Sequence, residues 1–499
     1  MKPFSPHISF IMIALVTLAG CAVGPDFRLP DMATPDHYTA APLPAQTASA
    51  PLESGAAQHF AFAEDLPGDW WTLFHSPELD KMIKKGIADS PTLAAAQAAL
   101  RKAEEDMRAV SGSIRYPAVN ANLQAGRQRI SGNADAGPSD TFNLYNASVG
   151  VSYTLDIFGG GRRQIEAYQA QIDYQSYIYE ATYLTLTANI VTAAIQEASL
   201  RAQLNTTRNI IAIQQKQLDV IKKQFELGAV SKTAVLSQET ELAMTKAGLP
   251  TMEKQLDLTR NALAVMIGQF PGEGKRPEFN LESLLLPEEL PVSLPSDLAR
   301  QRPDVRAAEA LIHQACAAVG VATANLYPQI TLSAGYGFQA VSTDILFNGQ
   351  SVVWSLGAGL LQPIFRGGEL TAKRRSAIAA YDQAAAQYRQ TVLKAFQDVA
   401  DVLRALETDA RTLQTQAQAE ASAKAALGLI GKQYELGAIS YPELLIAQRD
   451  YQKTWINVIT AQAQRYADTA ALFQALGGGW WNRKSTFLKA KFIQEENEE

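Results

Sequence analysis

The sequence predicts an α+β membrane protein in which each half of the chain supplies a β-hairpin and a very long helical hairpin. Three observations predict this class. Two segments alternate apolar and small polar residues, stretches of 66 and 59 residues contain no Gly or Pro, and the whole pattern repeats at an offset of about 210 residues. We therefore expect four strands, four long helical stretches and an internal duplication in each chain.

Composition restricts the class of function. The 499 residues are 47% hydrophobic and 19% charged, which is too apolar for disorder, and the chain is too long for one compact core. The net charge of −6 disfavours a nucleic-acid partner, because binding phosphates requires a basic surface. The mean hydropathy is −0.10 and no apolar run reaches 18 residues, which excludes a polytopic helical transporter but not a β-barrel.

The N-terminus has the order of a lipoprotein signal. Lys2 precedes an apolar stretch over residues 8–19, and small residues lead into Cys21. We predict that the first 20 residues are a signal peptide and that Cys21 is acylated. Residues 21–60 are rich in Pro, Ala and Thr without a period, and we expect them to form a lipidated tether. Ala22 resembles the outer-membrane sorting class of bacterial lipoproteins, and simple secretion with an accidental cysteine is the alternative.

Beyond residue 60 the chain repeats itself. We predict a first repeat over residues 61–275, a second repeat over 276–480 and a polar C-terminal tail over 481–499. Each repeat contains a helix, a β-hairpin and a long helical hairpin. The matching motifs are Ser90-Pro91 and Arg302-Pro303, Tyr116-Pro117 and Tyr327-Pro328, and the eight-residue segments that begin at Gln224 and Gln433.

The β-hairpins are predicted over residues 114–158 and 325–366. The predicted strands are residues 119–125, 145–157, 330–340 and 354–360. In the longer strands, apolar residues alternate with Ser, Thr, Asn and Gly. An ordinary soluble sheet is the alternative, but its inner face normally carries heavier aliphatic packing. The small polar face and lengths near the ~9–11 residues that cross a bilayer favour transmembrane strands.

The longest stretches without Gly or Pro, residues 162–227 and 369–427, predict the helical hairpins, with tips near residues 228 and 437. Heptad spacing at Leu204, Ile211 and Leu218 indicates coiled-coil packing. At 1.5 Å per residue, a helix of about 65 residues is roughly 100 Å long, which no globular domain hides.

Each long helix is predicted to end in a turn that the sequence repeats. Gly228 and Gly437 suit the left-handed position after a helix, and Ser231 and Ser440 suit the N-cap of the next one. Glu443 has capping-box spacing from Ser440. The near-identical turns are the best candidates for a partner-binding surface, and a turn with no further role is the alternative.

Four strands cannot close a barrel, because single-chain outer-membrane barrels begin at eight strands. Open strand edges in lipid would leave backbone amides unpaired. Three chains would supply a 12-stranded transmembrane β-barrel, and the same symmetry would gather the long helices into a helical barrel around a tunnel. We therefore predict a homotrimer.

A set of motifs spread over the mature chain is jointly specific. The motifs are the segment from Cys21 to Phe27, Trp70-Trp71 with Phe74, Ser90-Pro91-Thr92-Leu93, Ile157-Phe158-Gly159, Arg302-Pro303-Asp304-Val305-Arg306 and Leu476-Gly477-Gly478-Gly479-Trp480-Trp481. Through them the chain resembles the outer membrane factors, the TolC-like trimeric channel-tunnels of tripartite efflux pumps. The resemblance is strongest to the NodT-type lipoproteins of RND efflux systems.

The resemblance implies a trimer whose barrel is continuous with a periplasmic α-helical barrel. It also implies a mixed equatorial domain, built here from residues 70–85, 248–297 and those after Gly477. The implied function is passive export of small molecules, such as drugs and toxic compounds, that an inner-membrane RND-type pump and a periplasmic membrane-fusion adaptor hand over. The implied location is the outer membrane, with a lipid anchor and without cofactor or metal.

The resemblance also assigns candidate site residues. The adaptor-docking tips would be Leu227, Gly228, Ala229, Leu436, Gly437 and Ala438. The periplasmic aperture would be closed by Tyr434, Glu443, Ile446, Arg449 and Asp450. Ile446 stands where the family has an aspartate, so Glu443 or Asp450 is expected to pair with Arg449. Since Glu443 precedes Arg449 by six residues on one helix, the pair should form between neighbouring helices.

Other classes of protein find less support. The five histidines have no metal-ligand spacing and Gly-x-Ser-x-Gly is absent, so no enzyme is expected. Gly159-Gly160-Gly161 lacks the Lys of a phosphate loop and is better explained as a strand-to-helix corner. Cys316 is expected to be a buried apolar residue. The exit duct of a type I protein secretion system shares the predicted architecture, and a trimeric coiled-coil scaffold or adhesin shares the heptads, so both alternatives stay open.

Overall fold

The structure, a computed structural model, describes residues 22–30, 35, 37–52, 54–130, 140–273 and 277–483. The predicted signal peptide, the acylation site Cys21 and the predicted tail from residue 484 onward lie outside the described residues. The chain divides into two compact units. The first comprises residues 1–31, 99–175 and 307–389, and the second comprises residues 32–98, 176–306 and 390–499.

The two halves of the chain contain the same α-helices and β-strands in the same order, and the second half adds the short helix η3. The first half has α3 (Pro91–Arg115), β2 (Ala118–Ile130), β3 (Asp140–Leu155), α4 (Gly160–Glu226) and α5 (Lys232–Met266). The second half has α7 (Pro303–Ala324), β5 (Gln329–Ala340), η3 (Gly349–Ser351), β6 (Val352–Leu361), α8 (Glu369–Glu435) and α9 (Tyr441–Ala475). Both α4 and α8 have 67 residues, and both α5 and α9 have 35.

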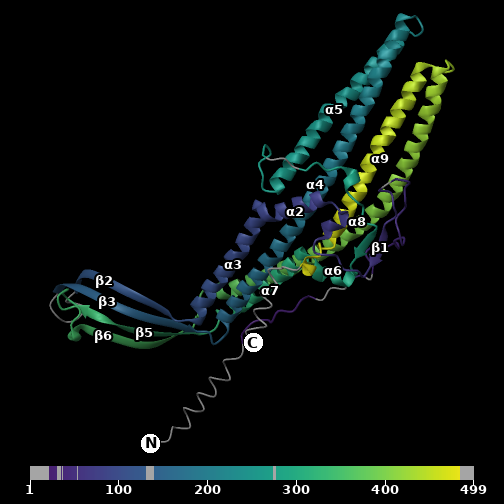
Figure 1. Cartoon of the computed structure of the whole chain (residues 1–499). Helices are drawn as coiled ribbons and strands as arrows, with labels where there is room; N and C mark the ends of the chain where they lie inside the picture. Colours follow the sequence, from purple (N-terminus) through teal and green to yellow (C-terminus); the bar gives the residue numbers. More distant parts are fainter. Residues whose placement is uncertain are drawn as a thin grey trace. The chain divides into compact units, whose positions relative to one another are not determined.

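Four strands form one antiparallel sheet in the order β2-β3-β5-β6 (Figure 1). Each predicted strand is present, which confirms the alternation as a strand signal. β2 and β3 extend further toward their connection than predicted, to Ile130 and from Asp140, because polar residues continue the hydrogen-bonded ladder without continuing the apolar alternation. Within the described residues, β2 pairs with β3 alone and β6 with β5 alone, so the sheet of one chain has two open edges.

The two faces of this sheet differ in chemistry. The register places Val149 beside Tyr336 and Tyr336 beside Trp354, and all three side chains are exposed. On the other face, Ser152 lies opposite Ser333. Directly paired residues on neighbouring strands share a face, and successive residues alternate between faces. One face is therefore aromatic and aliphatic, of the kind that lipid covers, and the other is small and polar.

A glycine-rich corner joins β3 to α4, as the sequence predicts for residues 159–161. The Asp156 carboxylate accepts hydrogen bonds from the backbone N–H groups of Gly161 (2.9 Å) and Arg162 (2.8 Å), which caps the start of α4. Gly159 has a φ of +75°, and a Cβ there would lie 2.6 Å from Ala22. Both the backbone conformation and the lack of space therefore require glycine at this corner.

The N-terminal segment, residues 22–27, packs within the same unit against α4 and α7. The guanidinium of Arg163 donates to the Asp26 carboxylate at 2.6 Å. The Phe27 ring stacks on His313 with the ring centroids 4.4 Å apart. The segment next to the predicted acylation site is therefore fixed to the folded body.

Helix α7 has the length and composition of a helix that could cross a membrane. Within the described residues, α7 alone is long and apolar enough to cross a membrane by length and composition, a test that buried core helices also pass. α7 packs on α4, where His313 Nε2 lies 2.9 Å from Glu166 Oε1 and Gln314 Nε2 donates to Gln171 Oε1 at 3.0 Å. Cys316 of α7 is buried, as predicted. These contacts account for α7 as a packed helix.

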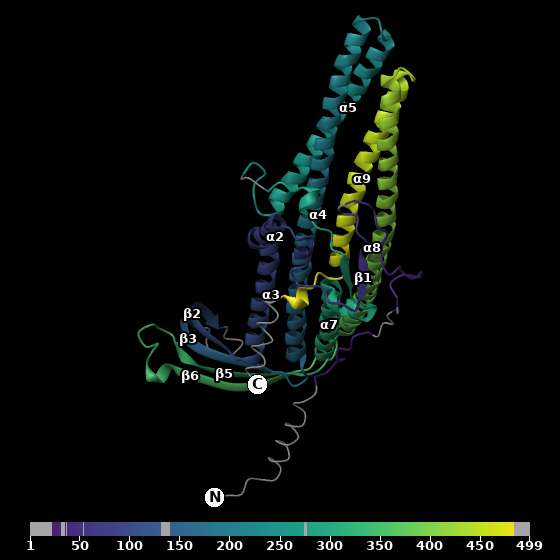
Figure 2. The same cartoon turned by 45° about the vertical axis from the view of Figure 1, so that its right-hand side comes forward.

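Within the second unit, α4 with α5 and α8 with α9 form two helical hairpins that run side by side with their tips at the same end (Figures 1 and 2). α8 continues past residue 427 through Gly428, because an exposed glycine costs a helix only about 1 kcal/mol. α5 continues through Pro250 to Met266, because the hydrogen bonds of the other turns offset the one that proline removes. Residues 248–266 therefore belong to the helical hairpin, which corrects their expected place in the mixed domain.

The mixed domain has a small sheet and an aromatic core. Its two strands, β1 (His59–Phe62) and β4 (Glu289–Val292), pair in parallel. Its helices are η1 (Trp70–Phe74), α2 (Pro77–Asp89), η2 (Leu281–Ser283), α6 (Pro295–Gln301) and η4 (Trp480–Asn482). Trp70 and Trp71 are buried, and the Trp70 ring lies 5.7 Å from that of Phe473 on α9. The tryptophan pair is therefore core that packs this domain onto α9.

A buried arginine fixes the stretch before β1. Arg465 of α9 is 1% exposed, and its guanidinium donates to the carbonyl oxygens of Ser54 (3.3 Å) and Ala56 (3.0 Å) and to Gln58 Oε1 (3.1 Å). Burial lowers the pKa of Arg465. The later part of the predicted tether thus packs on α9. A contact made to backbone carbonyls leaves no periodic signal in the sequence, which is why residues 21–60 read as structureless.

Candidate functional site

The tips of the two helical hairpins share one turn. At the first tip, the N–H groups of Gly228 and Ala229 donate to carbonyls of α4 at 2.9 and 2.8 Å. At the second tip, those of Gly437 and Ala438 donate to carbonyls of α8 at 3.0 and 2.9 Å. These are the paired bonds of a Schellman motif, and the glycines have φ of +76° and +72°. The predicted turn geometry is confirmed at both tips.

The helices that leave the tips begin with serine caps. Ser231 Oγ accepts a hydrogen bond from the N–H of Ala234 at 3.4 Å. At the second tip Ser440 forms a full capping box, in which Glu443 Oε2 accepts from the N–H of Ser440 at 3.1 Å. The predicted capping box is confirmed, and it occupies the Glu443 carboxylate at the start of α9.

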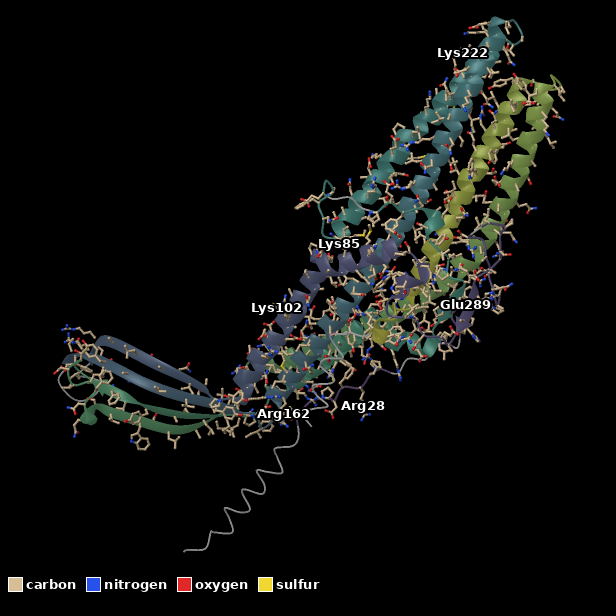
Figure 3. All side chains as sticks on the ribbon, viewed as in Figure 1. Arg28, Lys85, Lys102, Arg162, Lys222 and Glu289 are labelled. Atoms are coloured by element: carbon tan, nitrogen blue, oxygen red, sulfur yellow. The ribbon has the colours of Figure 1, made fainter. Side chains whose placement is uncertain are left out.

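Large aliphatic side chains project from both tips. Leu227 is 84% exposed and Leu436 is 85% exposed. Just behind the first tip, Lys222 of α4 pairs with Glu239 of α5 at 2.9 Å, and the Lys222 side chain lies near the end of the hairpin (Figure 3). Exposed leucines beside a rigid turn form a surface suited to a protein partner.

Polar contacts join the two hairpins behind the tips. Arg449 Nε of α9 donates to Glu241 Oε2 of α5 at 2.7 Å, and the Arg449 and Glu241 side chains are 59% and 10% exposed. The Tyr441 hydroxyl hydrogen-bonds Gln238 Oε1, and Gln238 Nε2 donates to the backbone oxygen of Gln214 at 3.0 Å. The charged pair is half in solvent, whereas the tyrosine–glutamine pair is buried.

An apolar cluster supports these contacts. Its buried members are Leu218, Ile221, Val235, Leu242, Tyr441, Leu444 and Leu445. The Tyr434 ring lies 5.6 Å from the Tyr441 ring, and the Tyr434 hydroxyl donates to Gln224 Oε1 at 3.4 Å. Burial raises the pKa of Tyr441, so its hydroxyl stays protonated and able to donate.

A groove of about 1020 Å³ lies between the hairpins next to the tips. Its walls combine aromatic and aliphatic side chains with amides, among them Ile213, Val220, Tyr434, Gln448, Tyr451 and Trp455. A mostly apolar groove with a few polar groups is the surface that an amphipathic helix or helical hairpin recognises.

Charged side chains elsewhere in the second unit form structural networks. Glu197 pairs with Arg201 at 2.7 Å, and Arg201 also contacts Glu278 at 2.9 Å. Burial raises the pKa of Glu197, and the neighbouring arginines oppose that rise. In the part of the chain that the structure describes, no group of three or more His, Cys, Asp or Glu side chains is arranged to hold a metal ion.

Comparison with known proteins assigns the family. The family model for outer membrane efflux proteins matches residues 82–269 and 294–478, which include the sheet and both helical hairpins. The chain belongs to the outer membrane efflux protein family.

Individual relatives agree over nearly the whole chain. It is 29% identical to the pyoverdine export outer membrane protein OpmQ of Pseudomonas aeruginosa and 30% identical to that of Pseudomonas putida, over 86% and 88% of this chain and 93% and 94% of theirs. It is 28% identical to the toluene efflux pump outer membrane protein TtgC of Pseudomonas putida, over 95% of this chain and 96% of that one. The solved outer-membrane channel OprN matches with a TM-score of 0.83 and 26% identity, over 92% of this chain and 100% of that one.

These matches establish the general function and location. The chain is an outer-membrane channel of an efflux system, which spans the outer membrane and extends into the periplasm. The predicted resemblance to outer membrane factors is therefore confirmed at the level of the family.

Within one chain, Arg449 pairs with Glu241 and not with Glu443 or Asp450. Glu443 is held in the cap of α9, and among the described residues the Asp450 carboxylate makes no ion pair, whereas Glu241 contacts Arg449 directly. Ile446 is exposed beside them. The repeat could have revealed Glu241, because α8 begins at Glu369 where α4 begins at Gly160, a constant offset of 209 residues that makes Glu241 the counterpart of Asp450.

Proposed function

We propose that three copies of this chain form the exit duct of a tripartite efflux pump, with a 12-stranded barrel in the outer membrane and a helical barrel in the periplasm. The observation that carries the proposal is the sheet, whose apolar face is exposed and whose two edges are unpaired within the described residues. In lipid such edges require partner strands, and three identical four-stranded sheets supply twelve. An internal duplication then gives every chain two similar helical hairpins.

The tips dock a periplasmic membrane-fusion adaptor, which connects the duct to an inner-membrane RND-type pump. The docking residues are Leu227, Gly228, Ala229, Leu436, Gly437 and Ala438. Three features support this assignment: the nearly complete exposure of both leucines, the matching backbone turns, and the apolar groove beside them. A rigid turn that recurs twice per chain offers the adaptor two closely similar contacts.

The exported compounds are small molecules that the pump selects. One relative is named for the export of pyoverdine and another for the efflux of toluene, two compounds that differ widely in polarity. A duct that passes cargo without binding it tightly accommodates such a range. We therefore assign selectivity to the pump and passive conduction to this chain.

The aperture closes where the two hairpins of each chain meet. Arg449 with Glu241 and Tyr441 with Gln238 hold the hairpins together, and Tyr434, Glu443, Ile446 and Asp450 surround these contacts. Separating the hairpins would break these two contacts and the hydrogen bond from Tyr434 to Gln224. Opening of the duct is therefore coupled to loss of these contacts.

The lipid anchor is an acyl group on Cys21. The N-terminal segment supports this, because residues 22–27, which follow Cys21 in the sequence, pack beside the corner between β3 and α4 at one end of the sheet. A chain carrying Cys21→Ser should incorporate no radioactive fatty acid, whereas the unchanged chain should be labelled. Equal labelling of both chains would reject Cys21 as the site.

Export and assembly are tested together in cells that lack their own copy of this channel. The full chain should lower accumulation of a fluorescent dye, and the chain extracted in detergent should have three times the monomer mass. A variant with Leu227→Asp and Leu436→Asp should keep the trimeric mass and lose export. Leu258→Asp, an exposed leucine of α5 away from the tips, is the matched control. A monomeric mass would refute the barrel, and normal export by the tip variant would refute the docking surface.

A further inference from the structure

Two carboxyl groups face each other on α8 and α9, far from the tips. Asp468 of α9 is 7% exposed, and its Oδ1 accepts a hydrogen bond from Gln464 Nε2 at 3.0 Å. Its Oδ2 is buried without a donor among the described residues. Asp409 of α8 lines the same small cavity as Gln464, the residue that bonds Asp468, and the Asp409 side chain hydrogen-bonds the Asp468 carboxyl group. Two carboxylates in contact repel each other, so the arrangement requires a proton or a cation between them.

The charged groups around the pair do not neutralise it. On α9, Arg465 directs its guanidinium to the stretch around residues 54–58. On α8, Arg404 and Arg411 both pair with Glu407. The described residues of the packed stretch 45–58 include no titratable side chain, and Tyr466 donates its hydroxyl to the backbone of Leu284 at 2.7 Å. No neighbouring element therefore supplies the missing positive charge from the described residues.

Burial and the neighbouring Asp409 carboxyl group both favour the protonated form of Asp468. Burial first, and then Asp409, raise the pKa of Asp468 from its ordinary value to about 7. A protonated Asp468 can donate its Oδ2 hydrogen to Asp409, which satisfies the otherwise unpaired oxygen. The geometry and the raised pKa thus both indicate that a proton lies between the two carboxyl groups.

We propose that Asp409 and Asp468 share one proton and that this contact fastens α8 to α9 in the middle of the second helical hairpin. Asp409 precedes the tip glycine Gly437 by 28 residues, which places the contact about 40 Å along the helix from the tip. The contact therefore acts apart from the Arg449–Glu241 pair. It is a pH-sensitive fastening rather than part of the aperture.

The first hairpin contains no such pair. At the 209-residue offset, the counterparts of Asp409 and Asp468 are Leu200, which is buried, and Thr259, whose hydroxyl bonds its own helix at 2.9 Å. Loss of the proton would therefore loosen α9 from α8 and leave the α4–α5 hairpin unaffected. In this way pH would act on one of the two hairpins of each chain.

The sign of the pH dependence follows from the raised pKa. Between the ordinary value of 3.8 and the folded value of about 7, the folded chain binds a proton that the unfolded chain has released. The contribution of this pair to the free energy of unfolding is therefore largest at acidic pH and is lost as pH rises toward and through about 7. Well above pH 7, the contribution of the pair to the free energy of unfolding no longer changes with pH.

The test is thermal unfolding of the full chain, purified in detergent without divalent cations, at pH about 5.5 and about 8.5. From the lower to the higher pH, the unfolding midpoint of the unchanged chain should fall by several degrees more than the midpoints of the Asp468 and Asp409 variants. Asp468→Asn and Asp409→Asn should both lose that extra shift, because an amide donates without titrating. Asp401→Asn, an exposed acid of α8, is the matched control and should behave as the unchanged chain.

A direct readout comes from infrared spectroscopy. The absorption band of a protonated carboxyl group should be present in the unchanged chain at pH about 6 and absent from Asp468→Asn. Equal pH shifts in all four chains would overturn the proposal. Stabilisation of the unchanged chain by added Mg²⁺, lost in both variants, would also overturn it by replacing the proton with a metal ion. If Asp468→Asn does not fold, Asp409→Asn decides the question, because Asp409 is only partly buried.

Discussion

The two helical hairpins are equal in backbone and unequal in side chains. Their helices have the same lengths and their tips the same hydrogen bonds, yet Tyr441 and Arg449 lie on the second hairpin and their partners Gln238 and Glu241 on the first. Identical halves could not pair in this way, because tyrosine and arginine need acceptors opposite them. The comparison teaches that two hairpins with the same backbone can meet through complementary side chains.

Breaking the buried contact between the hairpins should have the largest effect. Gln238→Leu leaves the Tyr441 hydroxyl without its acceptor in a buried site, and we expect the free energy of unfolding to fall by about 2 kcal/mol. Tyr441→Phe should lower the free energy of unfolding by a similar amount, because it leaves Gln238 Oε1 without its donor. The chain with both changes should lose less than the sum, as measured by thermal unfolding in detergent. Strictly additive losses would show that the two side chains are not coupled.

The tip glycines should respond equally, which tests whether the two turns are equivalent. Gly228→Ala and Gly437→Ala each place a Cβ in the left-handed region, which costs about 1–2 kcal/mol. Nothing lies within 4 Å of either added Cβ, so the cost should come from backbone conformation alone. Unfolding midpoints of the two variants should agree. A much larger loss at one tip would mean that its surroundings, not its backbone, set the requirement.

The half-exposed ion pair should matter less for stability than for opening. Arg449→Ala should lower the free energy of unfolding by only about 1 kcal/mol, because the Arg449 side chain is 59% exposed and its charge is largely screened by solvent. On the proposed role of this pair, the same change should raise single-channel conductance in planar bilayers. Arg404→Ala is the control, because among the described residues Arg404 forms its ion pair with Glu407 of its own helix. Unchanged conductance after Arg449→Ala would remove this pair from the closure of the duct.

The second tip has a full capping box and the first tip has only a serine cap. Exchanging this difference between the hairpins should have the smallest effect on the free energy of unfolding. Glu443→Ala removes half of the capping box and should cost about 0.5–1 kcal/mol. Ala234→Glu builds the equivalent box with Ser231 at the first tip and should gain about the same amount. Because Ala234 packs partly against the apolar cluster, thermal unfolding should be compared with Ala234→Gln as well. A loss in both Ala234 variants would show that packing outweighs the cap.

Local sequence signals predicted the elements and the tips. The alternation over residues 145–157 and the long stretches without Gly or Pro specify strands and helices through contacts between near neighbours. Gly228 and Gly437 were identified because a left-handed residue at the end of a helix admits few alternatives. Strands β1 and β4 were missed because four residues are too few to show a period.

Contacts between distant segments were not predictable from these signals. Glu241 lies on a different hairpin from Arg449, and nothing near it in the sequence marks it as a partner. Arg465 binds backbone carbonyls, which every residue possesses, so the stretch it fixes has no distinctive composition. Such pairings depend on the three-dimensional arrangement of helices, and only the repeat offset gives them a trace in the sequence.

The packing of the N-terminal segment sets an order of events during the maturation of the chain. Asp26 meets Arg163, and Pro25 accepts from Cys316, across 137 and 291 residues of sequence. The segment docks only once both halves have folded, since closing so long a loop precedes any gain from the contact. Until then residues 22–27 stay undocked from the folded body. On the proposed acylation of Cys21, folding thus sets the period during which residues 22–27 are undocked and within reach of the modifying enzymes.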